Sequence, residues 1–168
     1  MGLEKIRKKN YLREMRNFKE YQEVVYDIIG CAMEVHSTLK WGLLESVYSE
    51  ALCLELAEMG IEAEREAQIP CFYKGHQLEK SYRADMVVDD IVVELKSAVE
   101  IVPAHRSQLF NYMRLTQKPV GLLINFGKSG LQGERYAYIA ETNECVLLDK
   151  NMNLRREART DMEVEKNL

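Results

Sequence analysis

The segment RADMVVDDIVVELK, residues 83–96, places two acids and an amine among branched apolar side chains. Asp85, Glu94 and Lys96 stand beside what the pattern predicts to be a buried strand pair. Unpaired charge is costly to bury, so these groups need partners there. Two carboxylates can hold a divalent cation, and a nearby amine can assist hydrolysis at such a centre. The segment therefore raises the hypothesis of a metal-dependent hydrolytic site.

The register of the predicted hairpin brings the two acids together. If residues 89–90 form a two-residue turn, the pairing places Asp85 directly opposite Glu94. Side chains alternate along a strand, so Lys96 shares this face and the other face of the hairpin is wholly apolar. Opposed Cβ atoms lie about 4.5–5.5 Å apart, close enough for both carboxylates to chelate one cation. For an isolated triplet, however, a strand-surface salt bridge made by Lys96 is the commoner explanation.

Two helices are expected to carry further polar groups. Glu45 and Tyr48 lie one turn apart near the start of the second of them, although a lone acid there is more often a dipole partner. Gln108 and Tyr112 lie four residues apart on a later helix, with His105 one turn earlier. Taken singly, a surface amide, a core aromatic and a helix N-terminal histidine are the commoner explanations. Together they could line one wall of a groove.

The surrounding sequence predicts the elements that would position these residues. Apolar residues at helical spacing indicate one helix from Tyr21 to Leu39, and a second from Leu44 that stops before Gly60. Strands follow, with a turn at Gly75 and the hairpin described above. Pro103 opens a helix of about fifteen residues, and VGLLINF is typical of a strand buried on both faces. ERYAYIA and ECVLLD indicate a final hairpin.

Length and charge indicate one domain with two charged flanks. A chain of 168 residues is long enough for a single globular core. We divide it into a basic N-terminal arm, residues 1–18, one domain, residues 19–149, and a charged C-terminal tail, residues 150–168. The formal net charge is −4, which argues against tight binding of bulk nucleic acid but permits a positive groove. With no signal peptide or apolar span, we expect a cytoplasmic protein that has no membrane partner.

The whole set resembles the GxxExxY family of the PDDEXK nuclease superfamily, the restriction-endonuclease-like and RecB-like nucleases. Gly42, Glu45 and Tyr48 match the motif that names the family. The likeness covers residues from about 21 to 139, and the sequences that carry it are IIGCAMEVH, GLLESVYSEAL, YKG, YRADMVV, VVELKS, QLFNYMRLT and GLLINFG. It implies an α/β fold with a restriction-endonuclease-like core, a mixed β-sheet flanked by helices, and two N-terminal helices.

The resemblance also implies roles for individual residues. Asp85 and Glu94 would be metal ligands together with the carbonyl of Leu95, and Lys96 would lie beside the attacking water. Glu45 would be an additional acid, and Gln108 and Tyr112 match a QxxxY pattern that orients substrate or active site. His36 either faces the same site or is a packing histidine. Trp41 departs from the Gly-rich pair that usually precedes GLLE.

The expected function is a nuclease that hydrolyses phosphodiester bonds with Mg²⁺ or Mn²⁺, and DNA is favoured as its substrate. The alternative is a non-catalytic module of the same fold that binds nucleic acid or protein, since fold alone does not determine activity. A third interpretation is a homodimer or a subunit that is active only within a complex.

Overall fold

The structure is a computed structural model that describes residues 18–155 of the chain. A short 3₁₀ helix η1 (Lys19–Tyr21) leads into the helices, which are α2 (Gln22–Leu39), α3 (Glu45–Glu58) and α4 (Pro103–Thr116). The strands are β1 (Glu64–Tyr73), β2 (His76–Val88), β3 (Ile91–Lys96), β4 (Val120–Gly127), β5 (Gly130–Ile139) and β6 (Glu144–Leu148).

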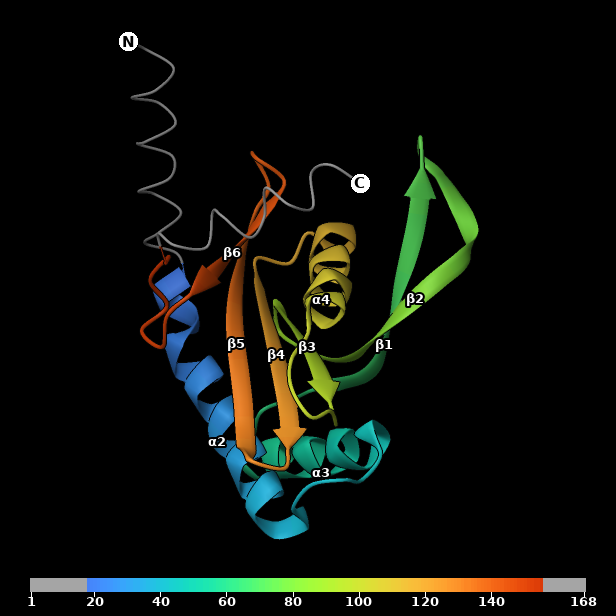
Figure 1. The fold of residues 1–168 in the computed structure, drawn as a ribbon. Helices are drawn as coiled ribbons and strands as arrows, with labels where there is room; N and C mark the ends of the chain where they lie inside the picture. The colour runs from blue at the N-terminus through green and yellow to red at the C-terminus, as the bar shows by residue number, and fades with distance from the viewer. Residues whose placement is uncertain (1–17, 156–168) are drawn as a thin grey trace.

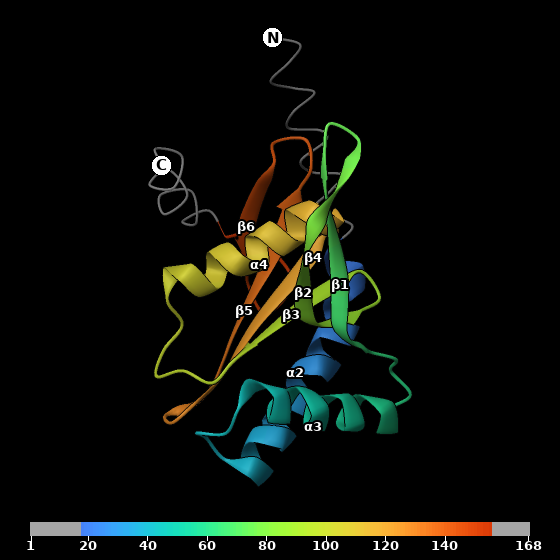
Figure 2. The same ribbon diagram turned by 90° about the vertical axis from the view of Figure 1, so that its right-hand side faces the viewer.

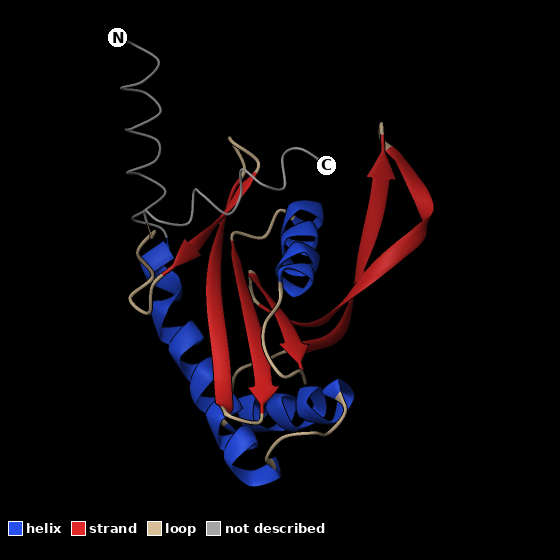
Figure 3. Cartoon of the chain, in the orientation of Figure 1, coloured by secondary structure: helices blue, strands red, loops and turns tan. Residues whose placement is uncertain are grey.

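The six strands form one mixed sheet in sequential order, from β1 at one edge to β6 at the other. Neighbouring strands are antiparallel except for β3 and β4, which are parallel. A parallel pair needs a crossover connection, and α4 supplies it (Figures 1 and 3). The predicted mixed sheet with flanking helices and two preceding helices is therefore confirmed.

Helices cover both faces of the sheet, with α2 and α3 on one side and α4 on the other (Figure 2). The core under α2 and α3 includes Ile28, Leu52 and Phe126, and the core under α4 includes Leu109 and Leu123. Alternate side chains of a strand enter opposite cores, which explains why every residue of β4 is buried. The prediction that this strand is buried on both faces is confirmed.

The final hairpin is longer than predicted. We expected its first strand to begin at Glu134, whereas β5 begins at Gly130. Gly130 pairs with Gly127, so β5 follows β4 along its whole length. The sequence GLQG has few residues that favour strands, and its conformation is set by this long-range pairing instead.

One glycine lets α4 approach the sheet closely. A Cβ atom built on Gly121 of β4 would clash with Met113 Sδ and lie 3.0 Å from Leu109 Cδ1. Both partners are fully buried, so neither can move into solvent. We expect Gly121→Ala to lower the free energy of unfolding by about 1–3 kcal/mol, the usual cost of overpacking, as measured by urea denaturation.

Gly30→Ala is the matched control for that measurement. Gly30 lies within α2, and a Cβ atom there would meet nothing within 4 Å. We expect a gain of about 0.5–1 kcal/mol, since alanine is a better helix former than glycine. Equal effects of the two substitutions would show that the contact between α4 and the sheet is less tight than the structure indicates.

Residues 1–17 and 156–168 lie outside the described part of the chain, and with them most of the predicted basic arm and charged tail. Phe18 and Met152, which flank the range 19–149, are buried in the core. Within residues 18–155, no helix combines the length and apolar character needed to cross a lipid bilayer.

Candidate active site

Strand β2 separates from β3 just where the acids lie. The pairs Val88 with Ile91 and Met86 with Val93 agree with the predicted register. Regular pairing then ends, so the expected ladder pair of Asp85 with Glu94 does not form. Polar side chains take the place of the missing ladder bonds, because a backbone group buried without a partner is costly.

Asp85 and Glu94 bridge the gap between the two strands. The amide of Asp85 donates to Glu94 Oε1 at 3.2 Å, and the amide of Leu95 donates to Asp85 Oδ2 at 2.8 Å. Each carboxyl group therefore accepts a hydrogen bond from a backbone amide of the opposite strand. The two carboxyl groups converge on one short stretch of the β3 edge.

The Glu94 carboxyl group is an acid in an environment that opposes its ionisation. Glu94 is 1% exposed. Burial is the main cause that raises the pKa of its carboxyl group to about 9, and repulsion from Asp85 is the second. Lys96 and a backbone hydrogen bond from Asp85 lower the pKa only in part. Without a further cation, Glu94 is mostly protonated at neutral pH.

Lys96 brings three elements together at the end of β3. Its Nζ lies 3.9 Å from Glu94 Oε2 and 3.9 Å from Glu45 Oε1, and it donates to Gln108 Oε1 at 2.9 Å. The residue is 8% exposed, so its ammonium group is desolvated and oriented rather than freely mobile. The amine and the two acids of the opening segment lie together, as the predicted alternation requires.

Helix α4 contributes a polar wall to the same place. Gln108 Nε2 donates to the hydroxyl of Tyr112 at 3.1 Å, and the ring of Tyr112 lies 5.8 Å from that of Tyr82 on β2. The ring Nδ1 of His105 accepts from the amide of Val102 at 3.2 Å, so this histidine caps the helix. Burial and then repulsion from Lys96 lower the pKa of His105.

Helix α3 presents Glu45 from its first turn, and Tyr48 holds the loop that precedes it. The Tyr48 ring stacks on Phe126 at 4.2 Å. Its hydroxyl donates to the Lys40 carbonyl at 2.8 Å and accepts from the Leu43 amide at 3.2 Å. Tyr48 is fully buried, so its role in this motif is to position the loop from which Glu45 emerges.

Asn125 is a positioning residue that sequence reasoning missed. It lies beside Lys96 in the parallel pair of strands and is fully buried. Its side chain accepts from the amide of Ala98 at 2.9 Å and donates to the carbonyl of Ala98 at 3.0 Å. The Asn125 side chain thus makes the hydrogen bonds that a strand backbone would make to Ala98, after β3 ends. A lone amide within the apolar run LLINF was the available signal, since buried polar groups need partners.

A second missed cluster fastens the start of α4 to the sheet. Arg106 donates from Nε and Nη2 to the two carboxylate oxygens of Glu134 at 2.8 and 2.7 Å. The hydroxyl of Tyr136 donates to the same carboxylate, and Phe110 packs edge-on against the Tyr136 ring. This bidentate pair therefore fixes the first turns of α4 against β5.

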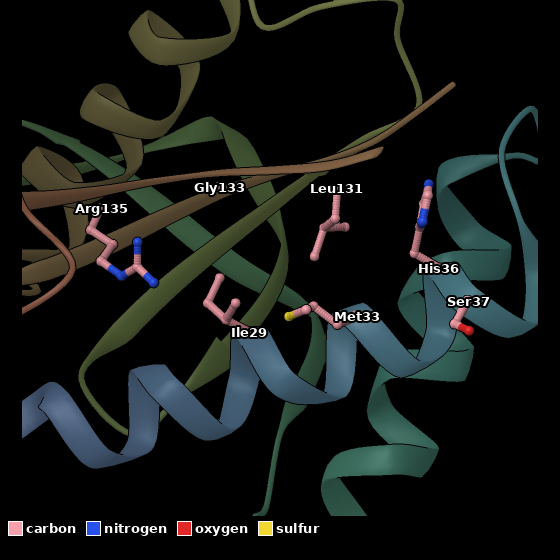
Figure 4. Close-up of a pocket in the computed structure, with 7 residues that line it drawn as sticks. All are labelled: Ile29, Met33, His36, Ser37, Leu131, Gly133 and Arg135. Atoms are coloured by element: carbon pink, nitrogen blue, oxygen red, sulfur yellow. The ribbon is translucent and has the colours of Figure 1, made fainter. Parts of the chain in front are cut away.

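His36 lies elsewhere. Its Nε2 donates to the Gly127 carbonyl at 2.9 Å and its ring tilts against Phe126, which favours the packing interpretation. It lines a hollow between α2 and β5, with Met33 and Arg135 among the other lining residues (Figure 4). This hollow contains none of the predicted acids, and α4 lies on the opposite side of the sheet.

The donor set of the acidic cluster fits a hard divalent cation. Its side-chain donors are carboxylate oxygens, and Mg²⁺ prefers oxygen ligands and keeps several waters. Among residues 18–155, no three His, Cys, Asp or Glu side chains group closely enough to hold an ion by themselves. A cation here would therefore need Asp85, Glu94, a backbone carbonyl and water. It would also offset the burial and the repulsion from Asp85 that together raise the pKa of Glu94.

The sequence is similar to that of a known protein family. A family model described as the PD-(D/E)XK nuclease superfamily matches residues 22–136. No curated protein matches the chain. A solved structure titled "Crystal structure of SSO0001" is 15% identical, with a TM-score of 0.40, and the match covers 95% of this chain and 84% of that chain. The matched span covers more than half of the chain and includes every predicted site residue, so the chain belongs to the PD-(D/E)XK nuclease superfamily.

Proposed function

We propose that the protein is a metal-dependent nuclease that hydrolyses phosphodiester bonds, with DNA favoured over RNA. The observation that carries the proposal is the convergence of Asp85, Glu94 and Lys96 at the end of β3. Superfamily membership supports nuclease chemistry in general. The matches of Gly42, Glu45 and Tyr48 further support the GxxExxY branch as its place within the superfamily.

The residues that would hold Mg²⁺ or Mn²⁺ are Asp85, Glu94 and the carbonyl of Leu95. The amide of Leu95 points to Asp85, and the amide and carbonyl of one strand residue point to the same side. That carbonyl is therefore directed toward the gap between β2 and β3. A bound divalent cation supplies charge neutralisation at phosphate and lowers the pKa of water.

Lys96 has the chemistry to act on the reacting groups. Its ammonium group is desolvated and oriented by Gln108 and by two acids, so it is preorganised to donate to a water or to a phosphoryl oxygen. Glu45 forms an ion pair with Lys96 from the solvent side, where the Glu45 side chain is 44% exposed. Gln108 and Tyr112 keep the amine aligned from α4 and face the substrate.

Metal-linked stabilisation and cleavage test the proposal together. With free Mg²⁺ at 100 times its dissociation constant, linkage adds about 2.7 kcal/mol to the free energy of unfolding. We expect the melting temperature of the wild-type protein to rise by several degrees and labelled DNA to be cleaved. Asp85→Asn should lose both responses, because it removes one of the two charged ligands.

Asp90→Asn is the control for that experiment, because Asp90 is an exposed acid in the β2–β3 turn, beyond the other end of β3. It should keep both responses to Mg²⁺. Cleavage that is equal in wild-type and Asp85→Asn preparations would indicate a contaminating nuclease and remove the support for the proposal. Absence of any metal response, together with nucleic-acid binding in EDTA, would favour the non-catalytic binding module. Activity that appears only after a partner is added would favour the complex subunit.

A further inference from the structure

The hairpin formed by β1 and β2 extends well beyond the helices that cover the rest of the sheet (Figures 1 and 2). Every residue from 72 to 83 is exposed; we refer to this stretch as the hairpin arm. Large apolar side chains that stay exposed to water add nothing to the stability of the fold. A cluster of them on one element therefore commonly marks an interaction surface. The arm therefore requires an explanation that the core does not provide.

The arm carries rings and apolar groups at its surface. Phe72 is 59% exposed, Tyr73 is 62%, Leu78 is 46% and Tyr82 is 47%. Tyr82 pairs with Ile69 of β1, and its ring lies against Tyr112 of α4. The arm thus begins with an aromatic contact at the active-site wall and continues outward from it.

The arm is also basic within an acidic domain. Residues 72–83 carry three Lys or Arg against one Glu, whereas residues 20–149 as a whole carry eleven against twenty-one. Neither Lys74 nor Lys80 forms an ion pair with any residue in the range 18–155. Lys74 lies over the Tyr73 ring at 5.4 Å instead. Arg83 pairs with Glu66 of β1 at 3.5 Å, so the positive charge that the arm offers to an anion is that of Lys74 and Lys80.

Strand geometry places these two kinds of group on one side. Alternation along β2 puts Lys80 on the side of Tyr82, and Tyr82 faces α4. Near the tip, Tyr73 pairs with His76, so these two side chains share a face. The active-site side of the arm therefore carries the Tyr82 ring and the Lys80 amine, and the Tyr73 ring follows near the tip, beyond a register shift at Pro70–Phe72.

We propose that the hairpin arm binds single-stranded nucleic acid and leads it to the site at the end of β3. Exposed rings stack on unpaired bases and lysines contact the phosphates, a combination typical of proteins that bind single strands. A duplex keeps its bases stacked inside and offers only phosphates and groove edges to such a surface. The proposal rests on the proposed nuclease function, because it names the substrate form that the same site would receive.

Binding measured without cleavage tests the arm. The probe is a fluorescein-labelled oligothymidylate of about 20 nucleotides, beside a duplex of the same length. Anisotropy is measured on the full chain in the Lys96→Ala background with Mg²⁺, and again in EDTA. We expect tighter binding of the single strand, and Tyr82→Ala and Lys80→Ala should each weaken it about tenfold. Tyr82→Phe should bind normally, because stacking needs the ring and not the hydroxyl.

Two controls separate a local effect from a general one. Tyr26 is a 76% exposed tyrosine on α2, on the other side of the sheet, and Lys150 follows β6 at the far edge. Tyr26→Ala and Lys150→Ala should change the affinity less than twofold.

Three results would overturn the proposal: equal effects of arm and control variants, a preference for the duplex, or no detectable binding under either condition. A change of oligomeric state in the arm variants without a change of affinity would show that the arm is a protein interface. If the arm binds single strands but the wild-type protein cleaves nothing, the nuclease proposal fails while this one stands. If the wild-type protein cleaves nucleic acid but the arm variants bind single strands normally, the proposal for the arm fails while the nuclease proposal stands.

Discussion

Lys96→Met is expected to lower the rate of DNA cleavage by at least about 100-fold while the protein stays folded and still responds to Mg²⁺. General acid–base and electrostatic contributions of a single positioned group commonly reach this size. Methionine keeps nearly the same length as the aliphatic part of lysine, carries a thioether in place of one methylene, and lacks the ammonium group. That group is the one held by Gln108 at 2.9 Å between Glu94 and Glu45.

The Mg²⁺-induced rise in melting temperature distinguishes a catalytic effect from a structural one. It should persist in Lys96→Met, because the proposed ligands Asp85, Glu94 and Leu95 are unchanged. Lys118→Met is the matched control, since Lys118 also pairs with an acid, Asp90, at 3.7 Å, but lies at the start of β3 rather than at its end. A Lys96→Met protein that cleaves within threefold of wild type would disprove the role assigned to this amine.

Glu94→Gln is expected to stabilise the metal-free protein and to abolish cleavage. Burial and the charge of Asp85 raise the pKa of Glu94 to about 9, above the value of a carboxyl group in an unfolded chain. The folded state therefore binds a proton more tightly than the unfolded state, and stability falls as pH rises from about 4.5 to about 9. Glutamine carries no charge at any of these values, so it avoids this loss.

The size of the effect follows from the same linkage. Each pH unit within the window corresponds to about 1.4 kcal/mol, so the advantage of Glu94→Gln in EDTA should grow by up to about 4 kcal/mol between pH 5 and pH 8. Thermal unfolding at the two pH values measures it. The variant should show no stabilisation by Mg²⁺, since it lacks one of the two charged ligands.

Glu134→Gln provides a control of opposite sign. Burial alone would raise the pKa of Glu134, but hydrogen bonds from Arg106 and Tyr136 outweigh it and lower the pKa. Its stabilising contribution is present above the pKa of the unfolded state and is lost as pH falls through the folded value. Glu134→Gln should therefore destabilise the protein at pH 8. If Glu94→Gln also destabilised it in EDTA, the raised pKa of Glu94 would be wrong.

Much of the local structure could be predicted from neighbouring residues alone. The helices beginning near Tyr21, Leu44 and Pro103 follow from apolar spacing and end signals, and the turn at residues 89–90 follows from the pattern around it. These features depend on contacts within a few residues, so a single sequence contains the information that specifies them. The extension of β5 back to Gly130 was missed because it depends on pairing with β4.

The candidate site divides in the same way. Side-chain alternation placed Lys96 on the side of Glu94, and the structure shows Lys96 Nζ 3.9 Å from Glu94 Oε2. The end of regular pairing at Met86 could not be read from the sequence, because it depends on how the β1–β2 hairpin leaves the sheet. The same is true of Asn125, whose partner Ala98 is 27 residues away.

By itself, the sequence determined the helices and most of the strands, which faces are apolar, and that Glu94 and Lys96 share one side of their strand. Only the tertiary structure decided that Glu45 and Gln108 reach the same amine, that β2 leaves β3 at Asp85, and that an aromatic and basic hairpin arm stands beside the site. The physical reason is range. Periodicity and turn chemistry act within a few residues, whereas these contacts depend on how α3, α4 and the β1–β2 hairpin pack around the end of β3.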